Sequence, residues 1–351
     1  MKENQKKFNA FKIAHLSDWE ATAREELNGI NPWEKLVHQR DGLRIQPYYD
    51  RKGANQPHPL LSVSENKFLG HRAWYNCPRL VVDEPGKTNQ KALECLQQGA
   101  DGIFFELGKE IDFKVLLKNI EWEYCSLNFL AIKNQETIAS ALADFVNEKK
   151  IKAEMFHGAF FCSTSPVSTR FPFASMGFQI KTSSPVAELI DAFRMMIASL
   201  KTNSLAPAGQ IAFSMTLGND FFLETAKLRS LRMVWNKFQV ATKAKTDAPL
   251  FVHAYLPPWV DTNYGPHSNM LKSTTAAMAA ILGGCDALTI EPEDSHHPMM
   301  SRVAINVSNI LREESYLSKV ADPFAGSYFM EDLTRTMSED AWKSIQPMVQ
   351  A

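Results

Sequence analysis

Side chains that could carry chemistry are few in the apolar stretches of this 351-residue chain. An imidazole, a phenol or an ammonium group can donate a hydrogen bond to developing negative charge, and an imidazole can also transfer a proton. The candidates of these types are His157, Lys181, His253 and Tyr255. The other polar candidates beside apolar runs are Asn76, Glu106, Asn128, residues 182–184 and Glu291. For each of them a hydrogen-bonded structural role is the simpler interpretation, so no catalytic residue is predicted.

The run from Glu293 to His297 offers two carboxylates and two imidazoles, which are ligands that a metal ion accepts. Adjacent histidines point apart in regular structure, and the run directly precedes a helical pattern. We therefore favour a solvated loop in which the carboxylates or Ser295 cap that helix, and we predict no metal site.

Positioning these side chains requires regular elements, and from about residue 73 short β-type runs alternate with helical ones. The predicted strands are 74–82, 102–107, 126–132, 153–161, 178–182, 211–217, 250–256 and 287–290. The predicted helices are 89–98, 112–119, 136–149, 186–200, 221–244, 269–282 and 298–314. Eight strands in nearly strict alternation with helices predict an α/β fold, a (β/α)₈ TIM barrel over residues 73–331. In such a barrel the polar residues at the strand ends gather at one mouth.

The helix predicted at 221–244 has a clear apolar stripe. Asn219 or Asp220 caps its start, and the stripe then follows helical spacing through Leu228, Leu231, Trp235 and Phe238. Lys227, Arg229, Arg232 and Lys237 occupy the other faces, so we expect a helix that lies on the barrel wall with its charges away from it.

Residues 1–72 are expected to form an N-terminal helical and extended arm for subunit contact. Ser17 followed by Glu20 has the spacing of a capping box, and Gly29 ends the helix. Its apolar stripe, which must find a surface, comprises Trp19, Ala23, Leu27 and Ile30. A short strand is possible at 43–49, and 50–66 lacks any periodicity. Residues 332–351 are expected to start a linker helix.

The composition excludes several classes of function. With 38 Lys+Arg against 39 Asp+Glu the net charge is −1, which gives no global reason to bind nucleic acid or an anionic membrane. No apolar run approaches the roughly 20 residues of a membrane span. Five unpaired cysteines and a polar first segment without a signal core predict a cytoplasmic protein.

Bulky residues on the predicted strands bear on whether a ligand could enter the barrel. Alternation requires some of them to point inward; they are Phe104, Phe105, Phe129, Met155, Phe156, Phe160, Phe161, Phe213 and Met215. The interior is therefore predicted to be filled, which favours a structural barrel over one that threads a long ligand.

Two long motifs carry a resemblance to a known family. Residues 218–235, GNDFFLETAKLRSLRMVW, resemble the N-F-F-x-E-x-A-K-L-R-A-x-R-x-x-W signature of methylmalonyl-CoA mutases. Residues 322–331, DPFAGSYFME, are similar to that family's D-P-W-x-G-S-Y-Y-x-E. Weaker similarity extends from Trp19 to about Thr334 and includes residues 261–264 and 302–304. The resemblance implies an acyl-CoA mutase barrel preceded by an arm that embraces a partner subunit.

The sequence departs from the family's catalytic pattern in three places. Where catalytic chains have G-Y-H at the end of the fifth strand, residues 181–184 read KTSS. Their R-x-Y-x-G-F segment has no counterpart around 66–72. The chain reaches Ala351 without the cobalamin domain and its D-x-H-x-x-G motif. The helical pattern at 338–345 breaks off, so truncation and loss of that domain from the gene are both open interpretations.

The resemblance leads to three hypotheses. The first is the small, or β, subunit of an adenosylcobalamin-dependent mutase that interconverts methylmalonyl-CoA and succinyl-CoA. This chain would be inactive alone, with adenosylcobalamin in the partner large, or α, subunit. The second is a barrel that binds acyl-CoA and works with a separate cobalamin-binding protein; His157, Lys181, His253 and Tyr255 would then face the thioester or carboxylate. The third is a non-enzymatic scaffold.

Overall fold

The computed structural model describes residues 14–50, 69, 72–152, 156–163, 175–180, 184–201, 211–243, 250–260 and 268–350. Its main sheet is parallel throughout and follows the order β3-β11-β10-β9-β8-β7-β6-β5-β4. The strands are β3 (Tyr75–Asn76), β4 (Arg79–Val81), β5 (Gly102–Leu107), β6 (Ser126–Ala131), β7 (Ala159–Cys162), β8 (Ser175–Ile180), β9 (Ile211–Thr216), β10 (Phe251–Leu256) and β11 (Ala287–Ile290). Apart from the consecutive β3 and β4, each strand follows its neighbour in sequence order, as in a TIM barrel.

The sheet closes on itself through its first strand. β3 pairs with β11 and β4 with β5, and only Cys77 and Pro78 separate β3 from β4. Cys77 N–H donates to Leu288 C=O at 2.8 Å, and Phe104 N–H donates to Pro78 C=O at 2.9 Å. The predicted strand 74–82 is therefore split in two, because Pro78 has no N–H to donate at its centre.

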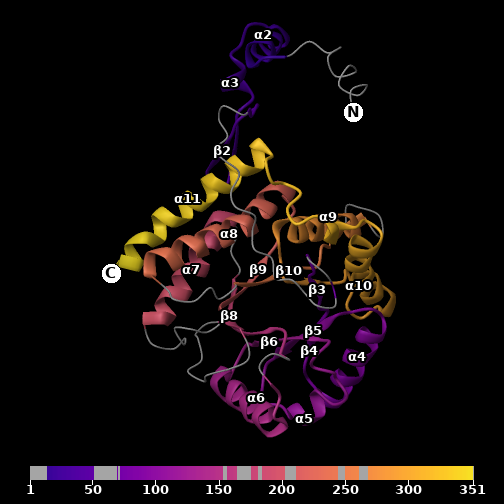
Figure 1. Ribbon diagram of the computed structural model, residues 1–351. Coiled ribbons are helices and arrows are strands. Elements are labelled where there is room, and N and C mark those ends of the chain that lie inside the picture. Colours follow the sequence, from indigo (N-terminus) through magenta and orange to yellow (C-terminus); the bar gives the residue numbers. More distant parts are fainter. Residues whose placement is uncertain are drawn as a thin grey trace, which may run out of the picture.

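Helices cover the outer face of the barrel (Figure 1). They are α4 (Pro85–Gln97), α5 (Phe113–Leu116), α6 (Gln135–Lys149), α7 (Pro185–Lys201), α8 (Phe221–Thr242), α9 (Ser268–Gly283), α10 (Pro298–Glu313) and α11 (Tyr328–Gln350), with the 3₁₀ turn η2 (Leu317–Lys319). The predicted α/β barrel is confirmed. The helix predicted at 112–119 is only one turn long. The strand predicted at 153–161 is observed as β7, which begins six residues after the predicted start and ends one residue after the predicted end.

Two apolar clusters stabilise the barrel. The larger one lies between the sheet and the helices, and it includes the outward residues Phe105, Phe129, Phe160 and Phe213. The smaller cluster fills the inside of the barrel and comprises Cys77, Phe104, Leu130, Ala159, Phe161, Ala212 and Ala287. Strand alternation sends neighbouring aromatic residues to the two different clusters.

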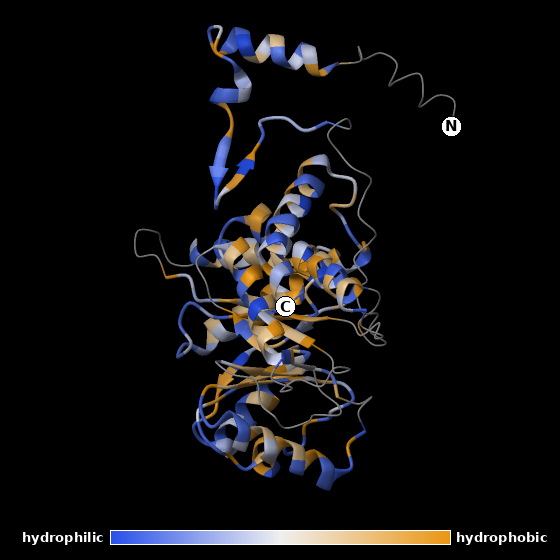
Figure 2. Ribbon diagram, turned by 90° about the vertical axis from the view of Figure 1, so that its left-hand side faces the viewer, coloured by the Kyte–Doolittle hydropathy of each residue, from blue (hydrophilic) through white to orange (hydrophobic). Residues whose placement is uncertain are grey.

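The N-terminal arm stands away from the barrel (Figures 1 and 2). Its described part is α2 (Leu16–Glu26), α3 (Pro32–Lys35) and an antiparallel hairpin of β1 (His38–Arg40) and β2 (Leu43–Ile45). The Trp19 ring packs on Trp33 and on Tyr48, each with ring centroids 5.1 Å apart. Arg40 binds the Asp220 carboxylate, which ties the hairpin to the start of α8. The arm thus has an aromatic core of its own.

The capping box predicted at Ser17 is wrong. The N-cap of α2 is His15, whose backbone N–H donates to the Asp18 carboxylate at 2.8 Å, and Ser17 lies inside the helix. The predicted stripe exists, but among its residues only Ala23 is buried, and Ile30 is 50% exposed.

The last helix, α11, packs along α8 and α7 on the outside of the barrel. Its buried face includes Leu333, Met337, Ala341 and Ile345. The segment predicted as the start of a linker helix therefore belongs to a helix that is part of the barrel body, and whether it also leads to another domain stays a prediction. Among the described helices, none is both long and apolar enough to span a membrane.

Candidate functional site

The inside of the barrel is crossed at mid-height by a layer of aromatic side chains. The Phe104 ring stacks on the His253 ring with centroids 4.5 Å apart, and Phe161 lies 5.8 Å from Phe104 and 5.7 Å from His253. All three residues have 0% exposure. Because they come from β5, β7 and β10, on different sides of the barrel, the layer blocks its axis at this level.

His253 is held by hydroxyl groups from both neighbouring strands. Its Nδ1 lies 2.7 Å from Ser214 Oγ of β9, and its Nε2 lies 2.9 Å from Thr289 Oγ1 of β11. The Thr289 hydroxyl donates to Cys77 C=O at 2.6 Å, so it accepts from the imidazole. The network therefore assigns the proton to Nε2 and makes Nδ1 the acceptor of the Ser214 hydroxyl.

The His253 imidazole is neutral in this setting. Burial lowers its pKa to about 3, and neither described hydroxyl partner bears a charge that would oppose the shift. With both ring nitrogens engaged and no exposure, the side chain has no free position for a substrate atom. Its geometry is that of a satisfied polar residue in a packed core.

An ion-pair cluster lies at the carboxyl ends of β5, β10 and β11. Arg79 Nε donates to Glu106 at 2.8 Å, and Arg79 Nη1 donates to Glu291 at 2.8 Å. Tyr255 hydrogen-bonds to Glu291, and burial together with that carboxylate raises the pKa of the phenol to about 12. Two carboxylates and one guanidinium give this cluster a formal charge of −1, so the cluster itself offers no net positive charge to an anionic ligand.

Of the four predicted donors, the three that the structure describes do not come together. His253 and Tyr255 share the inward face of β10, with His253 in the core and Tyr255 at the mouth. His157 lies at the opposite end of the barrel, where it bridges to the start of β6 and stacks on Tyr75 with centroids 6.0 Å apart. Burial lowers the pKa of His157. Lys181 lies outside the described residues, as do residues 182–183.

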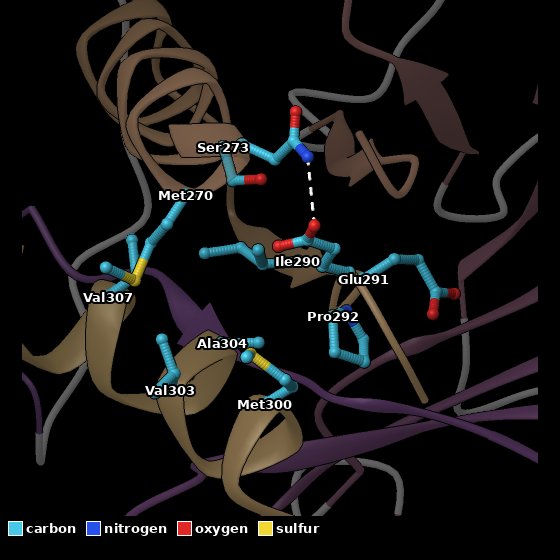
Figure 3. Close-up of a pocket in the computed structure, with 11 residues that line it drawn as sticks. Met270, Ser273, Ile290, Glu291, Pro292, Met300, Val303, Ala304 and Val307 are labelled. Atoms are coloured by element: carbon cyan, nitrogen blue, oxygen red, sulfur yellow. Dashed lines mark hydrogen bonds between the residues drawn. The ribbon is translucent and has the colours of Figure 1, made fainter. Parts of the chain in front are cut away.

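The structure also describes a small pocket outside the sheet, between α9, α10 and the end of β11 (Figure 3). Met270 and Met300 lie across it near Ile290, and Asn269 donates to Glu293 at 3.0 Å at its rim. Its volume is about 30 Å³, roughly the share of one water molecule in the liquid. Pockets for cofactors and metabolites measure about 300–1,000 Å³, so this one is too small for either.

The run from Glu293 to His297 does not cap α10 as predicted. The N-cap is His297, without a side-chain hydrogen bond to the helix, and Asp294 instead accepts from the backbone N–H of His296 at 2.8 Å. Among the residues that the structure describes, no three His, Cys, Asp or Glu side chains gather as a metal site.

A set of buried charges on α8 was not predicted from the sequence. Lys227, Arg229 and Arg232 were expected on faces away from the wall, but their exposures are 0%, 2% and 6%. Lys227 binds Glu188 of α7 at 2.6 Å, and Arg232 binds Asp286, just before β11, at 2.8 Å. The partners lie 39 and 54 residues away in sequence, so spacing within the helix gave no signal for them.

Arg229 joins the two long motifs of the sequence. Its guanidinium binds the carboxylate of Asp322 and lies 3.3 Å from that of Glu331. Asp322 opens the second motif and Glu331 closes it. The charged residues of both motifs therefore hold helices together, and none of these three reaches the barrel interior.

The sequence of this chain is similar to those of methylmalonyl-CoA mutases. Residues 189–351 match the family described as "Methylmalonyl-CoA mutase". The chain is 27% identical to the methylmalonyl-CoA mutase small subunit of Porphyromonas gingivalis over 97% of this chain and 64% of that protein. It is 36% identical to the small subunit from Streptomyces virginiae over 38% of this chain and 22% of that one, and 33% identical to a methylmalonyl-CoA mutase of Cereibacter sphaeroides over 40% and 20%. The chain spans less than two thirds of the length of each of these relatives.

Solved structures give weaker likenesses. A dihydropteroate synthase of Burkholderia cenocepacia aligns with a TM-score of 0.38 and 12% identity over 70% of this chain and 94% of that one. The enzyme of Yersinia pestis aligns with a TM-score of 0.35 and 11% identity over 74% and 100%. Scores this low carry no inference about function.

Proposed function

Because this chain belongs to the methylmalonyl-CoA mutase family, we propose that it is the small subunit of a two-subunit mutase, and that it contributes structure rather than catalysis. The observation that carries the proposal is the stack of Phe104, His253 and Phe161 across the barrel axis. A substrate threaded along this axis would have to displace three fully buried rings. The isomerisation of methylmalonyl-CoA and succinyl-CoA is then a property of the assembly.

The described mouth does not suit adenosylcobalamin. Arg79, Glu106, Glu291 and Tyr255 hydrogen-bond to one another, so their polar groups are already engaged. No described histidine points a free ring nitrogen into the barrel, since His253 has both nitrogens bound. We therefore assign the cofactor to the partner, which is the large subunit in this proposal, and derive no step through it in this chain.

The arm supports the assignment of a partner. Trp19, Trp33 and Tyr48 form a compact aromatic group that lies apart from the barrel, and Ile30 on the same segment is half exposed. Ile30 and Tyr48 are the large apolar side chains exposed on the described arm, and contact with a partner subunit would cover them. The five cysteines are all free thiols, which supports the cytoplasmic location proposed with this function.

The test uses the chain with and without a cognate large subunit. We expect the chain alone to take up no adenosylcobalamin by absorbance, to bind no acyl-CoA by calorimetry at millimolar ligand, and to show no isomerase activity. The mixture should be active. Tight cobalamin uptake or turnover by this chain alone would refute the proposal.

Two other outcomes identify the competing functions. Acyl-CoA binding that is lost when Tyr255 or Lys181 is replaced would favour a substrate-binding barrel that works with a separate cobalamin protein. Full activity and stability of the large subunit without this chain would favour a scaffold.

A further inference from the structure

Three ionisable side chains meet in the core where α7, α8 and β9 join. Lys227 Nζ of α8 lies 2.6 Å from Glu188 Oε2 of α7 and 2.5 Å from Glu224 Oε2 of α8. It also donates to the C=O of Thr216, the last residue of β9, at 2.6 Å. Side-chain exposures are 0% for Lys227, 3% for Glu188 and 7% for Glu224. We call this group the α7–α8 triad.

The three N–H donors of the Lys227 ammonium are all engaged. The ammonium has three N–H donors and three oxygen neighbours. Glu188 Oε1 accepts the backbone N–H of Thr216 at 2.7 Å, while Glu224 Oε2 has, among the described residues, no partner besides its ion pair with Lys227. Glu224 Oε1 lies against Gly218, where a Cβ would come within 3.0 Å of it. Little solvent and few further hydrogen-bond donors are therefore available to stabilise a negative charge on either carboxylate.

Charge does not balance when both carboxylates are ionised. Two negative groups then share one positive group, which leaves one uncompensated negative charge in an apolar environment, a costly arrangement. One bound proton makes the triad neutral. Burial raises the pKa of Glu188 to about 7; Lys227 opposes this shift and Glu224 adds to it.

The buried charges on the helices around the triad are paired elsewhere. On α8, Arg229 binds Asp322 and Arg232 binds Asp286. On α7, Asp191 pairs with Arg194 near the surface, and on α11, which packs on both helices, Arg335 pairs with Asp332 and Glu339 while Glu331 faces Arg229. Among the described residues, the imbalance thus belongs to the triad itself.

We propose that the α7–α8 triad is a proton-binding latch, which holds the first turns of α7 and α8 against the end of β9 when it carries one proton and loosens when that proton leaves. The carboxylates of Glu188 and Glu224 share that proton, since both lie against the single ammonium of Lys227. The latch belongs to the barrel of this chain and does not depend on the proposed function. It makes the stability of the α7–α8 junction sensitive to pH near neutrality.

The direction in which pH changes the stability follows from the coupling between proton binding and folding. A group whose pKa is higher in the folded chain than in the unfolded chain stabilises the fold at low pH, and this contribution is lost as the pH rises through its folded value. For Glu188 the folding equilibrium constant should fall about tenfold from pH 6 to pH 8. His253, whose pKa is lowered, acts in the opposite direction over this range, so the effect is read from a difference between variants.

The experiment compares urea unfolding of the full chain and of Glu188→Gln between pH 6 and pH 8. The amide mimics the neutral carboxyl group, so this variant should lack the tenfold fall in the folding equilibrium constant that the unaltered chain shows. Asp191→Asn, on the exposed side of the same helix, is the matched control and should show the same tenfold fall as the unaltered chain. Parallel pH profiles for the unaltered chain and Glu188→Gln would overturn the proposal.

A second measurement holds even if Glu188→Gln fails to fold. The carboxyl carbons of Glu188 and Glu224, followed by ¹³C NMR in the unaltered chain, should together show one proton bound at pH 6 and lost by pH 8. Two carboxylates that both remain ionised down to pH 5 would also overturn the latch.

Discussion

His253 shows how a residue type that suggests catalysis can be purely structural. Its ring lies between Phe104 and two hydroxyl groups, and all of its hydrogen-bonding capacity is satisfied. From the sequence, His253 and Tyr255 could be placed on one face of one strand. That Ser214 and Thr289 flank the ring could not be predicted, because the register between β9, β10 and β11 is set by tertiary packing.

The buried histidine makes the protein sensitive to acid. The pKa of His253 is lowered from 6.5 to about 3, so the unfolded chain binds a proton below pH 6.5 that the folded chain refuses. The stability present above pH 6.5 is therefore lost as the pH falls, by about 2 kcal/mol at pH 5. We predict that His253→Gln, although less stable at pH 7.5, lacks this part of the decline when urea unfolding is followed from pH 7.5 to pH 5.

A suitable control for this prediction is His38→Gln, on an exposed strand of the arm. It should show the same decline as the unaltered chain. If His253→Gln and the unaltered chain lose stability in parallel between pH 7.5 and pH 5, the imidazole is not the group that resists protonation.

Among the helices, α8 is the one whose burial differs most from what its sequence pattern predicts. The stripe of Leu228, Leu231, Trp235 and Phe238 is buried as predicted, and Asp220 caps the helix by accepting from Leu223 N–H at 3.2 Å. The charged faces are buried too, because α7, α9 and α11 enclose the helix on the sides that the sheet leaves open. A period of 3.6 residues detects one apolar face; it cannot detect charges that are paired by distant segments.

Arg229 should therefore be among the most important residues for the stability of the fold. Replacing it by methionine removes the cation and leaves the carboxylates of Asp322 and Glu331 buried beside each other. Loss of one partner from a buried ion pair costs about 3–5 kcal/mol. We expect Arg229→Met to lower the free energy of unfolding by that amount, measured with urea. Arg335→Met, whose side chain is 28% exposed, should cost less than about 1 kcal/mol.

α8 and α9 approach closely at a glycine. A Cβ on Gly283 would lie 2.9 Å from Leu228 Cβ and 3.1 Å from Thr225 C=O, both on rigid parts of α8. We predict that Gly283→Ala destabilises the chain by about 1–3 kcal/mol through this overlap. Gly86→Ala, also helical but with its nearest atom at 3.8 Å, should be neutral or stabilising by up to about 1 kcal/mol. Thermal unfolding that ranks the two variants in the opposite order would contradict the close contact.

Strand boundaries illustrate what local sequence can predict. β5 and β11 match their predicted ranges because each is a short apolar run bounded by polar or glycine residues. The start of the fourth predicted strand differs from the structure: within the described part of that run, from residue 156, Ala159–Cys162 pairs as β7 and His157 makes an isolated bridge. Gly158, with φ 145°, interrupts the ladder at that point.

For the whole molecule, barrel and arm are different kinds of structure. The barrel buries its apolar residues on both faces of the sheet, and its fold class could be predicted from alternation alone. The arm touches the barrel through few groups, among them Arg40 at Asp220 and Tyr49 at Phe329. Only part of its apolar stripe is covered by the described residues: Trp19 packs on Trp33 and Tyr48, while Ile30 stays half exposed.

This separation predicts that stability and association can be changed independently. Trp19 contacts Trp33 and Tyr48, which belong to the arm, so Trp19→Ala should leave the barrel's urea midpoint unchanged. If the arm binds the large subunit, the same change should weaken association by about 2 kcal/mol, roughly 30-fold in Kd, as is usual for an aromatic residue at the centre of an interface. Titration calorimetry with the large subunit measures this Kd.

Val240→Ser, 79% exposed near the distal end of α8, is the control and should alter neither the Kd nor the urea midpoint. Unchanged affinity for Trp19→Ala would place the subunit interface elsewhere, on the barrel itself.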